Sequence, residues 1–99
     1  MIPTNKEPET DNRKIMPGAE PFLLAAGDQG CLLIHGISGS PQVFRETGEH
    51  LYRAGITAHG ILLAGHGTRV NDLHGCTYSD WLHSAERGMD RLKQQCRTI

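Results

Sequence analysis

The sequence lacks long apolar runs and an excess of charge of either sign. No apolar stretch approaches the roughly 20 residues that a membrane-spanning helix needs. Ten Lys and Arg residues face eleven Asp and Glu residues, which gives a net charge of -1. This balance argues against electrostatic binding to nucleic acid or to an anionic membrane. We therefore expect no nucleic-acid partner and no membrane partner.

Cysteine pairs and targeting segments are also missing. The three cysteines, Cys31, Cys76 and Cys96, form no C-x-x-C pair and are too few for a disulfide framework. The N-terminus has no apolar stretch of about 7 to 15 residues, which a secretory signal peptide requires. The sequence predicts reduced thiols and a cytoplasmic protein.

Motifs for metals and dinucleotides are absent. Six histidines are present, but no H-E-x-x-H motif and no paired Cys/His spacing accompanies them. Gly36 and Gly39 do not form a G-x-G-x-x-G fingerprint, so they do not predict a dinucleotide site. We expect neither a metal nor a cofactor.

Composition divides the chain near residue 17. Residues 1–17 contain three prolines and many charges but few apolar side chains. Burial of so few apolar groups cannot offset the entropy lost on ordering. We interpret residues 1–17 as a disordered polar tail and residues 18–99 as part of a single α/β domain.

Apolar runs bounded by turn residues predict strands at 21–24, 31–34 and 56–61. Residues 31–34 show no apolar/polar alternation, which is typical of a strand covered by helices on both faces. A helix is predicted from Ser40-Pro41 to Gly55, with Ser as N-cap and Gly as C-terminal stop. Its expected inner face consists of Val43, Phe44, Leu51 and Tyr52.

A second, amphipathic helix of roughly 17 to 19 residues follows Thr77. Thr77 and Asp80 have the spacing of a capping box. Its expected inner face consists of Trp81, Leu82, Ala85, Met89, Leu92 and Cys96.

The order strand, strand, helix, strand, helix predicts an α/β fold. We expect a short antiparallel hairpin at the sheet edge, then parallel strands joined by crossover helices. So few strands make an incomplete sheet, and residues 96–99 are interpreted as the first step into another strand. An exposed sheet edge of this kind favours self-association.

The turn after Ile34 is the strongest candidate site. Gly36 and Gly39 permit backbone angles that other residues resist, so amides in this turn can converge on one point. The turn leads into a helix and follows a central strand, where open α/β sheets bind ligands. The pattern favours an anion, including the oxyanion of acyl transfer.

Three motifs in register carry a resemblance to a known family. The segments His35–Pro41, Gly65–Gly67 and Asp80-Trp81 together resemble bacterial carboxylesterases of the α/β-hydrolase fold. More narrowly, they resemble the branch that includes monoacylglycerol lipase-like esterases. The resemblance runs from about residue 18 to residue 99 and implies the N-terminal portion of such an enzyme.

The resemblance implies a serine carboxylic ester hydrolase that acts on a small-molecule ester. It implies that the backbone N–H of Ile37 belongs to the oxyanion hole. The residues that it assigns to the supporting loops are His35, Gly36, Ser38 and Gly39 in the first loop and Gly65, His66 and Gly67 in the second. In this family the serine lies in a G-x-S-x-G elbow, with the acid and the histidine later. In relatives this elbow comes after the region that matches residues 18–99. We therefore expect none of the catalytic triad here and no activity from this chain alone.

The nearest approach to an elbow is Gly36–Ser40, which ends in Ser instead of Gly. We interpret Ser38 as a turn residue and not as the nucleophile. Other functions stay open: an aminopeptidase or a thioesterase of the same fold, or a non-catalytic remnant that binds a partner. The sequence does not predict the acyl length or the alcohol of the ester.

Overall fold

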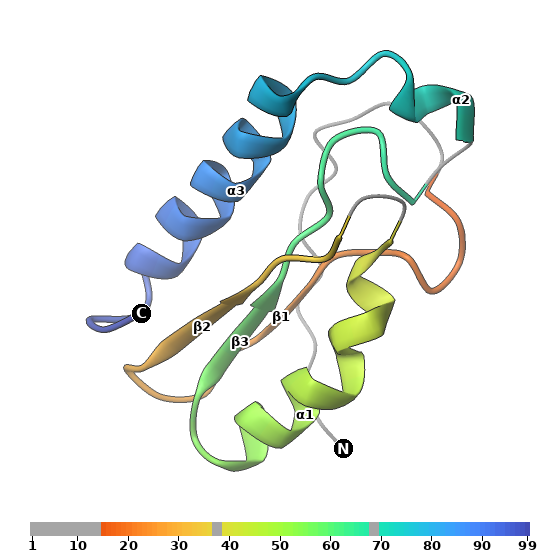
Figure 1. Ribbon diagram of the computed structural model, residues 1–99. Helices are drawn as coiled ribbons and strands as arrows, with labels where there is room; N and C mark the ends of the chain where they lie inside the picture. Colours follow the sequence, from red (N-terminus) through yellow and green to blue (C-terminus); the bar gives the residue numbers. More distant parts are fainter. Residues whose placement is uncertain (1–14, 37–38, 68–69) are drawn as a thin grey trace.

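The computed structural model describes residues 15–36, 39–67 and 70–99. It shows a three-stranded sheet with a helix against each face (Figure 1). The elements in chain order are β1 (Phe22–Leu24), β2 (Gly30–Leu33), the 3-10 helix η1 (Pro41–Phe44), α1 (Arg45–Arg53), β3 (Thr57–Gly60), α2 (Val70–Leu73) and α3 (Tyr78–Lys93).

The strand order in the sheet is β1-β3-β2. β3 runs antiparallel to β1 and parallel to β2. The predicted hairpin of the first two strands is therefore wrong, although the antiparallel edge strand and the parallel pair with its crossover helix are confirmed. All four residues of β3 are buried. Buried backbone N–H and C=O groups need hydrogen-bond partners. Between β1 and β2, the buried strand β3 finds these partners along both of its edges.

Alternation along β1 divides the core between the two faces of the sheet. Phe22 and Leu24 pack with α1, whereas Leu23 packs with Leu92 of α3. Because successive side chains of a strand point to opposite faces, α1 and α3 cover opposite faces. The sheet is thus covered on both sides, as the unbroken apolar run in β2 had indicated.

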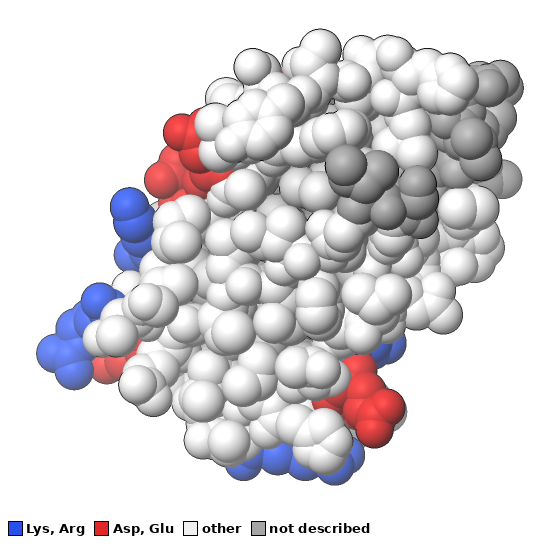
Figure 2. Space-filling model, in the orientation of Figure 1, with Lys and Arg blue, Asp and Glu red and all other residues white. Residues whose placement is uncertain are grey.

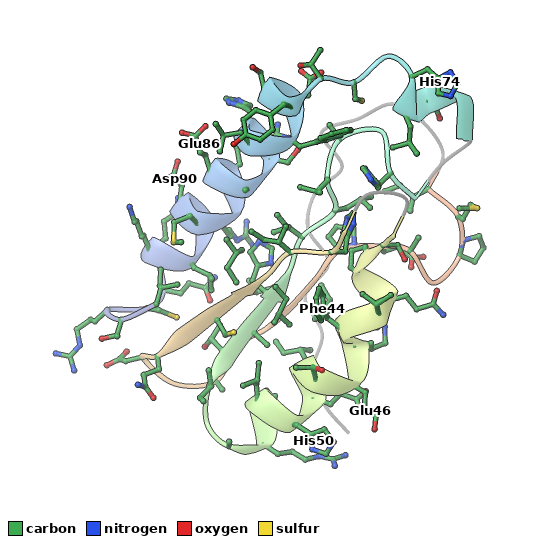
Figure 3. All side chains as sticks on the ribbon, viewed as in Figure 1. Phe44, Glu46, His50, His74, Glu86 and Asp90 are labelled. Atoms are coloured by element: carbon green, nitrogen blue, oxygen red, sulfur yellow. The ribbon has the colours of Figure 1, made fainter. Side chains whose placement is uncertain are left out.

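The first helix begins with a 3-10 turn. Pro41 occupies the first turn, as predicted, and α1 starts only at Arg45. Phe44 points from this segment toward the sheet (Figure 3) and packs on the core with two residues of α1. The placement of Val43 on the inner face is wrong, because its side chain is 65% exposed. A 3-10 turn has three residues per turn, which rotates Val43 out of the face that an α-helix would give it.

The second helix begins at the predicted capping box. The backbone N–H of Asp80 bonds to Thr77 Oγ1, and the backbone N–H of Thr77 bonds to Asp80 Oδ2. α3 has 16 residues, slightly fewer than expected. The placement of Leu82 on the inner face is wrong, since it is 48% exposed. Ser84 and Gly88 are buried instead.

Gly88 allows α3 to lie close to the sheet. A Cβ atom at this position would lie 2.5 Å from Ile61 Cγ2 and 3.0 Å from Leu32 Cδ1. On the other side of α3, Glu86 and Asp90 point away from the sheet (Figure 3). The helix is therefore amphipathic, and the small residues Ser84 and Gly88 lie at the middle of the face that packs against the sheet.

The two ends of the described chain also contact the sheet region. Residues 1–14 of the predicted tail lie outside the described residues, but the backbone N–H of Met16 donates to the carbonyl of Gly67 at 2.6 Å. At the other end, Thr98 forms an isolated parallel bridge with Gln29. This one bridge agrees with the interpretation of residues 96–99 as the first step into a strand, which stays a prediction. No helix in the described part of the chain combines the length and the apolar character needed to cross a membrane.

Candidate functional site

The first loop of the site is fixed by His35, which follows β2 and is only 3% exposed. Its Nε2 accepts a hydrogen bond from the backbone N–H of Leu63 at 3.1 Å. Since Nε2 is the acceptor, Nδ1 carries the proton and donates to the carbonyl of Gly36 at 2.8 Å. His35 thereby joins the loop after β2 to the segment that follows β3.

The second loop, Gly65–Gly67, lies beside the first. Gly65 and Gly67 have φ values of 76° and 72°, in the left-handed region that glycine adopts most easily. His66 between them is buried, and its Nδ1 lies 3.1 Å from the carbonyl oxygen of Ala64. The His66 and His35 rings have centroids 4.8 Å apart. The two loops therefore meet through their histidines.

Helix α3 holds the second loop in place. Trp81 Nε1 donates to the carbonyl of Ala64 at 3.0 Å, and the backbone N–H of Ala64 donates to Ser84 Oγ at 3.1 Å. The Trp81 ring also meets the edge of His66, with centroids 5.8 Å apart. Sequence reasoning assigned Trp81 to the core and did not single out Ser84. The sequence signal that could have found Ser84 was its position four residues before Gly88, which in turn lies four residues before Leu92. All three residues are buried on one face of α3.

Burial controls the charge of His35. Desolvation lowers the pKa of its imidazole below the ordinary value of 6.5. The bond to Gly36 opposes this shift, and the nearby His66 adds to it. The imidazole is therefore neutral at pH 7, and the lone pair of its Nε2 accepts the hydrogen bond from the backbone N–H of Leu63. In this arrangement His35 is a structural hydrogen-bond acceptor and has no lone pair available for proton abstraction.

The structure places six of the eight predicted site residues, and all six lie in these two loops. The described members are His35, Gly36, Gly39, Gly65, His66 and Gly67. The backbone N–H of Gly39 donates to the carbonyl of Gly36 at 3.0 Å, so these two glycines are in direct contact. Ile37 and Ser38 lie outside the described residues, so the role of Ile37 in an oxyanion hole stays a prediction.

Within residues 15–36, 39–67 and 70–99, no cluster of three or more His, Cys, Asp or Glu side chains has metal-binding geometry. Cys76 bonds instead to the backbone carbonyl of Asp72, at 3.5 Å. The backbone N–H groups of Gly39 and His66 donate within these loops, to the carbonyls of Gly36 and Leu63.

Comparison with known proteins agrees with this geometry. A thermostable monoacylglycerol lipase from Bacillus sp. (strain H-257) is 42% identical over 85 residues, which are 86% of this chain and 34% of the lipase. A solved structure from a study of LipS and LipT, two metagenome-derived lipolytic enzymes, matches with a TM-score of 0.81 and 37% identity. That match covers 84% of this chain and 34% of the other. No protein-family model matches.

The sheet topology and these similarities identify the chain as part of an α/β-hydrolase fold. Within that superfamily the chain is similar to lipolytic enzymes, a monoacylglycerol lipase among them, as its three motifs predicted. It spans about a third of the length of the two relatives.

Proposed function

We propose that the chain forms the oxyanion side of a carboxylic ester hydrolase of the serine carboxylesterase and lipase type. The observation that carries the proposal is the bond from the Leu63 N–H to His35 Nε2. It joins the loops that follow two parallel strands, β2 and β3, at their carboxyl ends. Open α/β sheets bind their ligands at this edge. The names of the two relatives support an ester as the substrate.

The proposed role of the first loop is to stabilise negative charge. A serine outside this chain would attack the ester carbonyl, and the carbonyl oxygen would become an oxyanion. The backbone N–H of Ile37 would donate to that oxygen, while the neutral His35 holds the loop. Loss of one such donor lowers kcat by about 100-fold to 1,000-fold.

The chain alone is proposed to be inactive, because its sequence contains no G-x-S-x-G elbow. Purified chain is expected to give no turnover of a p-nitrophenyl ester above buffer. Turnover that disappears in the Ser38→Ala variant would contradict the proposal, because it would make Ser38 the nucleophile.

A graft tests the function itself. This chain replaces the matched region of the Bacillus lipase, and the rest of that lipase supplies the missing part. We expect the grafted protein to hydrolyse p-nitrophenyl esters and monoacylglycerol. A graft that folds cooperatively but is inactive would contradict the proposed function.

Two variants of the graft test the oxyanion donor. Ile37→Pro removes the backbone N–H, whereas Ile37→Ala keeps it and serves as the matched control. We expect kcat of the Pro variant to be about 100-fold to 1,000-fold below that of the Ala variant. Equal kcat values would remove Ile37 from the mechanism.

We further propose that the protein works in the cytoplasm. All three cysteines are free, and Cys96 is buried. Unpaired thiols are typical of reducing compartments. Quantitative labelling of three thiols in protein purified from the cytoplasm would support this location, and a disulfide in that preparation would contradict it.

A further inference from the structure

Residues 16–19 form a turn that precedes β1. Pro17 and Gly18 occupy its two central positions, and the backbone N–H of Ala19 donates to the carbonyl of Met16 at 3.0 Å. Gly18 has a φ of 88°, which lies in the left-handed region. Proline at the first central position and a positive φ at the second are typical of a type II turn, which favours glycine there. The local sequence therefore determines the shape of this segment.

The turn contacts the second loop of the site through its two outer residues. The backbone N–H of Met16 donates to the carbonyl of Gly67 at 2.6 Å. Ala19 is only 4% exposed, and a Cβ atom added to Gly67 would lie 3.3 Å from the Cβ of Ala19. A hydrogen bond and a close packing contact thus join two segments that lie far apart in the sequence.

The turn has a rigid support on its other side. The backbone N–H of Gly18 donates to the Glu20 carboxylate at 2.9 Å, and β1 begins two residues later at Phe22. All three residues of β1 are buried in the core. Because the turn is attached to a buried strand, it can hold a neighbouring loop in a fixed position.

From Gly67 a continuous series of contacts reaches the first loop. Gly67 directly follows His66, whose ring centroid lies 4.8 Å from that of His35. His35 in turn bonds to the carbonyl of Gly36 and to the N–H of Leu63. Both histidines are only 3% exposed, so neither ring has free space in which to turn. A displacement of Gly67 is therefore expected to displace the first loop as well.

We propose that the turn at residues 16–19 is a positioning element of the ester-hydrolase site, which holds the second loop against His35 and thereby fixes the oxyanion side of the site. The inference rests on the proposed function and adds to it a segment that lies outside the three family motifs. The residues of the turn act through Gly67 and His66, so they are positioning residues and not catalytic ones.

The link between the turn and the second loop is not ionic. It consists of the backbone groups of Met16 and Gly67 and the side chain of Ala19. Charged side chains gather at the left and lower edges of the face shown in Figure 2, whereas the described residues at its upper right, toward the loop end of the sheet, show none in this view. The effect of the turn is therefore expected to persist in high salt, which screens exposed charges.

The test uses the graft described above with two matched glycine variants. Gly18→Ala places a side chain at a φ of 88°, and the nearest atom to the new Cβ is 3.4 Å away, so strain of the backbone is its main effect. Gly55→Ala places the same side chain at a φ of 84°, with no atom within 4 Å. Gly55 precedes β3, at the end of the sheet opposite to the two loops, so it controls for backbone strain alone.

We expect kcat of the Gly18→Ala graft for a p-nitrophenyl ester to be about tenfold to 100-fold below that of the Gly55→Ala graft. KM is expected to change little, because a misplaced oxyanion donor weakens mainly the transition state. Gly18→Asn is expected to recover most of the kcat, since asparagine tolerates a left-handed backbone. Equal kcat values for the two alanine grafts, or a loss confined to KM, would overturn the proposal.

A second measurement needs neither activity nor the graft. Hydrogen exchange in the 99-residue chain follows the amides of His66 and Leu63, which donate to the Leu63 carbonyl and to His35 Nε2. We expect both amides to exchange about tenfold faster in Gly18→Ala than in Gly55→Ala, and urea denaturation checks that the two variants have lost similar stability. Equal exchange rates would overturn the proposal. If Gly18→Ala does not fold, Pro17→Ala loosens the turn without strain and is expected to change the exchange in the same direction.

The outcomes separate this inference from the proposed function. An unmodified graft that folds but is inactive contradicts the proposed function, and the exchange measurement then still decides whether the turn holds the second loop. An active unmodified graft with equal kcat values for the two alanine variants contradicts the positioning role alone.

Discussion

Ser84 on α3 binds the backbone of Ala64 in the loop after β3. Its hydroxyl accepts from the Ala64 N–H at 3.1 Å and donates to the carbonyl of Asp80, also at 3.1 Å. Trp81 donates to the Ala64 carbonyl from the same helix. Both backbone groups of Ala64 are thus hydrogen-bonded by α3, which joins the helix to the loop through this residue.

Ser84→Ala removes the acceptor for the Ala64 N–H. A partly buried donor without a partner costs about 1–2 kcal/mol, so we expect the free energy of unfolding to fall by that amount. Urea denaturation measures the change. Ser79→Ala is the matched control, because Ser79 is exposed near the start of the same helix and its substitution is expected to change stability by less than about 0.5 kcal/mol. Equal effects at the two positions would contradict the role assigned to Ser84.

Stability is expected to fall in mild acid because of His35. Burial lowers the pKa of this imidazole below 6.5, so the unfolded chain binds the proton more readily than the folded chain. The stabilising contribution is full above pH 6.5 and is lost as the pH falls through the folded-state pKa. Unfolding free energies from about pH 8 to about pH 5 measure this slope.

Two glutamine variants isolate the residue responsible. His35→Gln keeps an acceptor in reach of the Leu63 N–H but does not titrate, so the slope is expected to be smaller than in the unmodified chain. His74→Gln changes an exposed histidine and is the matched control for the substitution itself. The interpretation fails if the slope of the His35 variant matches that of the unmodified chain.

Gly88→Ala is expected to destabilise the chain although alanine favours helices. The added methyl group would meet Ile61 Cγ2 at 2.5 Å, and overpacking of this kind costs about 1–3 kcal/mol. The gain in helix propensity offsets at most about 1 kcal/mol. Combination with Ile61→Ala removes the closest contact, the one with Ile61 Cγ2, so the double variant is expected to be more stable than the sum of the two single effects predicts. Strict additivity would show that the two side chains do not conflict.

Thr77→Ala is expected to cost about 1 kcal/mol of unfolding free energy, because it removes the side chain that caps α3. Thr77→Ser retains the hydroxyl and is expected to retain most of the stability. Thermal denaturation compares the two variants. Equal losses would indicate that the methyl group of Thr77, and not its cap, stabilises the helix.

Local sequence patterns predicted the secondary structure well but not the pairing of strands. The ranges 21–24, 31–34 and 56–61 contain β1, most of β2 and β3, because short apolar runs between turn residues have few alternatives. The choice of neighbour for β1 depends on which strand must be paired on both edges. This is a property of the assembled sheet, and no window of sequence contains it.

The candidate site was predictable to the level of its two loops. The glycines and the two histidines identify both loops in the sequence, because few residue types other than glycine adopt a left-handed backbone or fit a short turn. The contacts of Ser84 and Trp81 with Ala64 were not predictable, since they join a side chain to backbone groups that every residue carries. The exposure of Val43 was missed for a local reason, because the sequence does not distinguish a 3-10 first turn from an α-helical one.

The contact between Cys96 and Gly27 has a consequence for the order of folding. It joins groups 69 residues apart, and closing so long a loop is entropically costly and slow. During synthesis α1 can dock on β3 as soon as both have left the ribosome, but α3 and residues 96–98 complete the sheet edge only after the whole segment has emerged. Until then the outer edge of β2 is unpaired. Residues 96–98 must reach this edge before a strand of another nascent chain pairs with it.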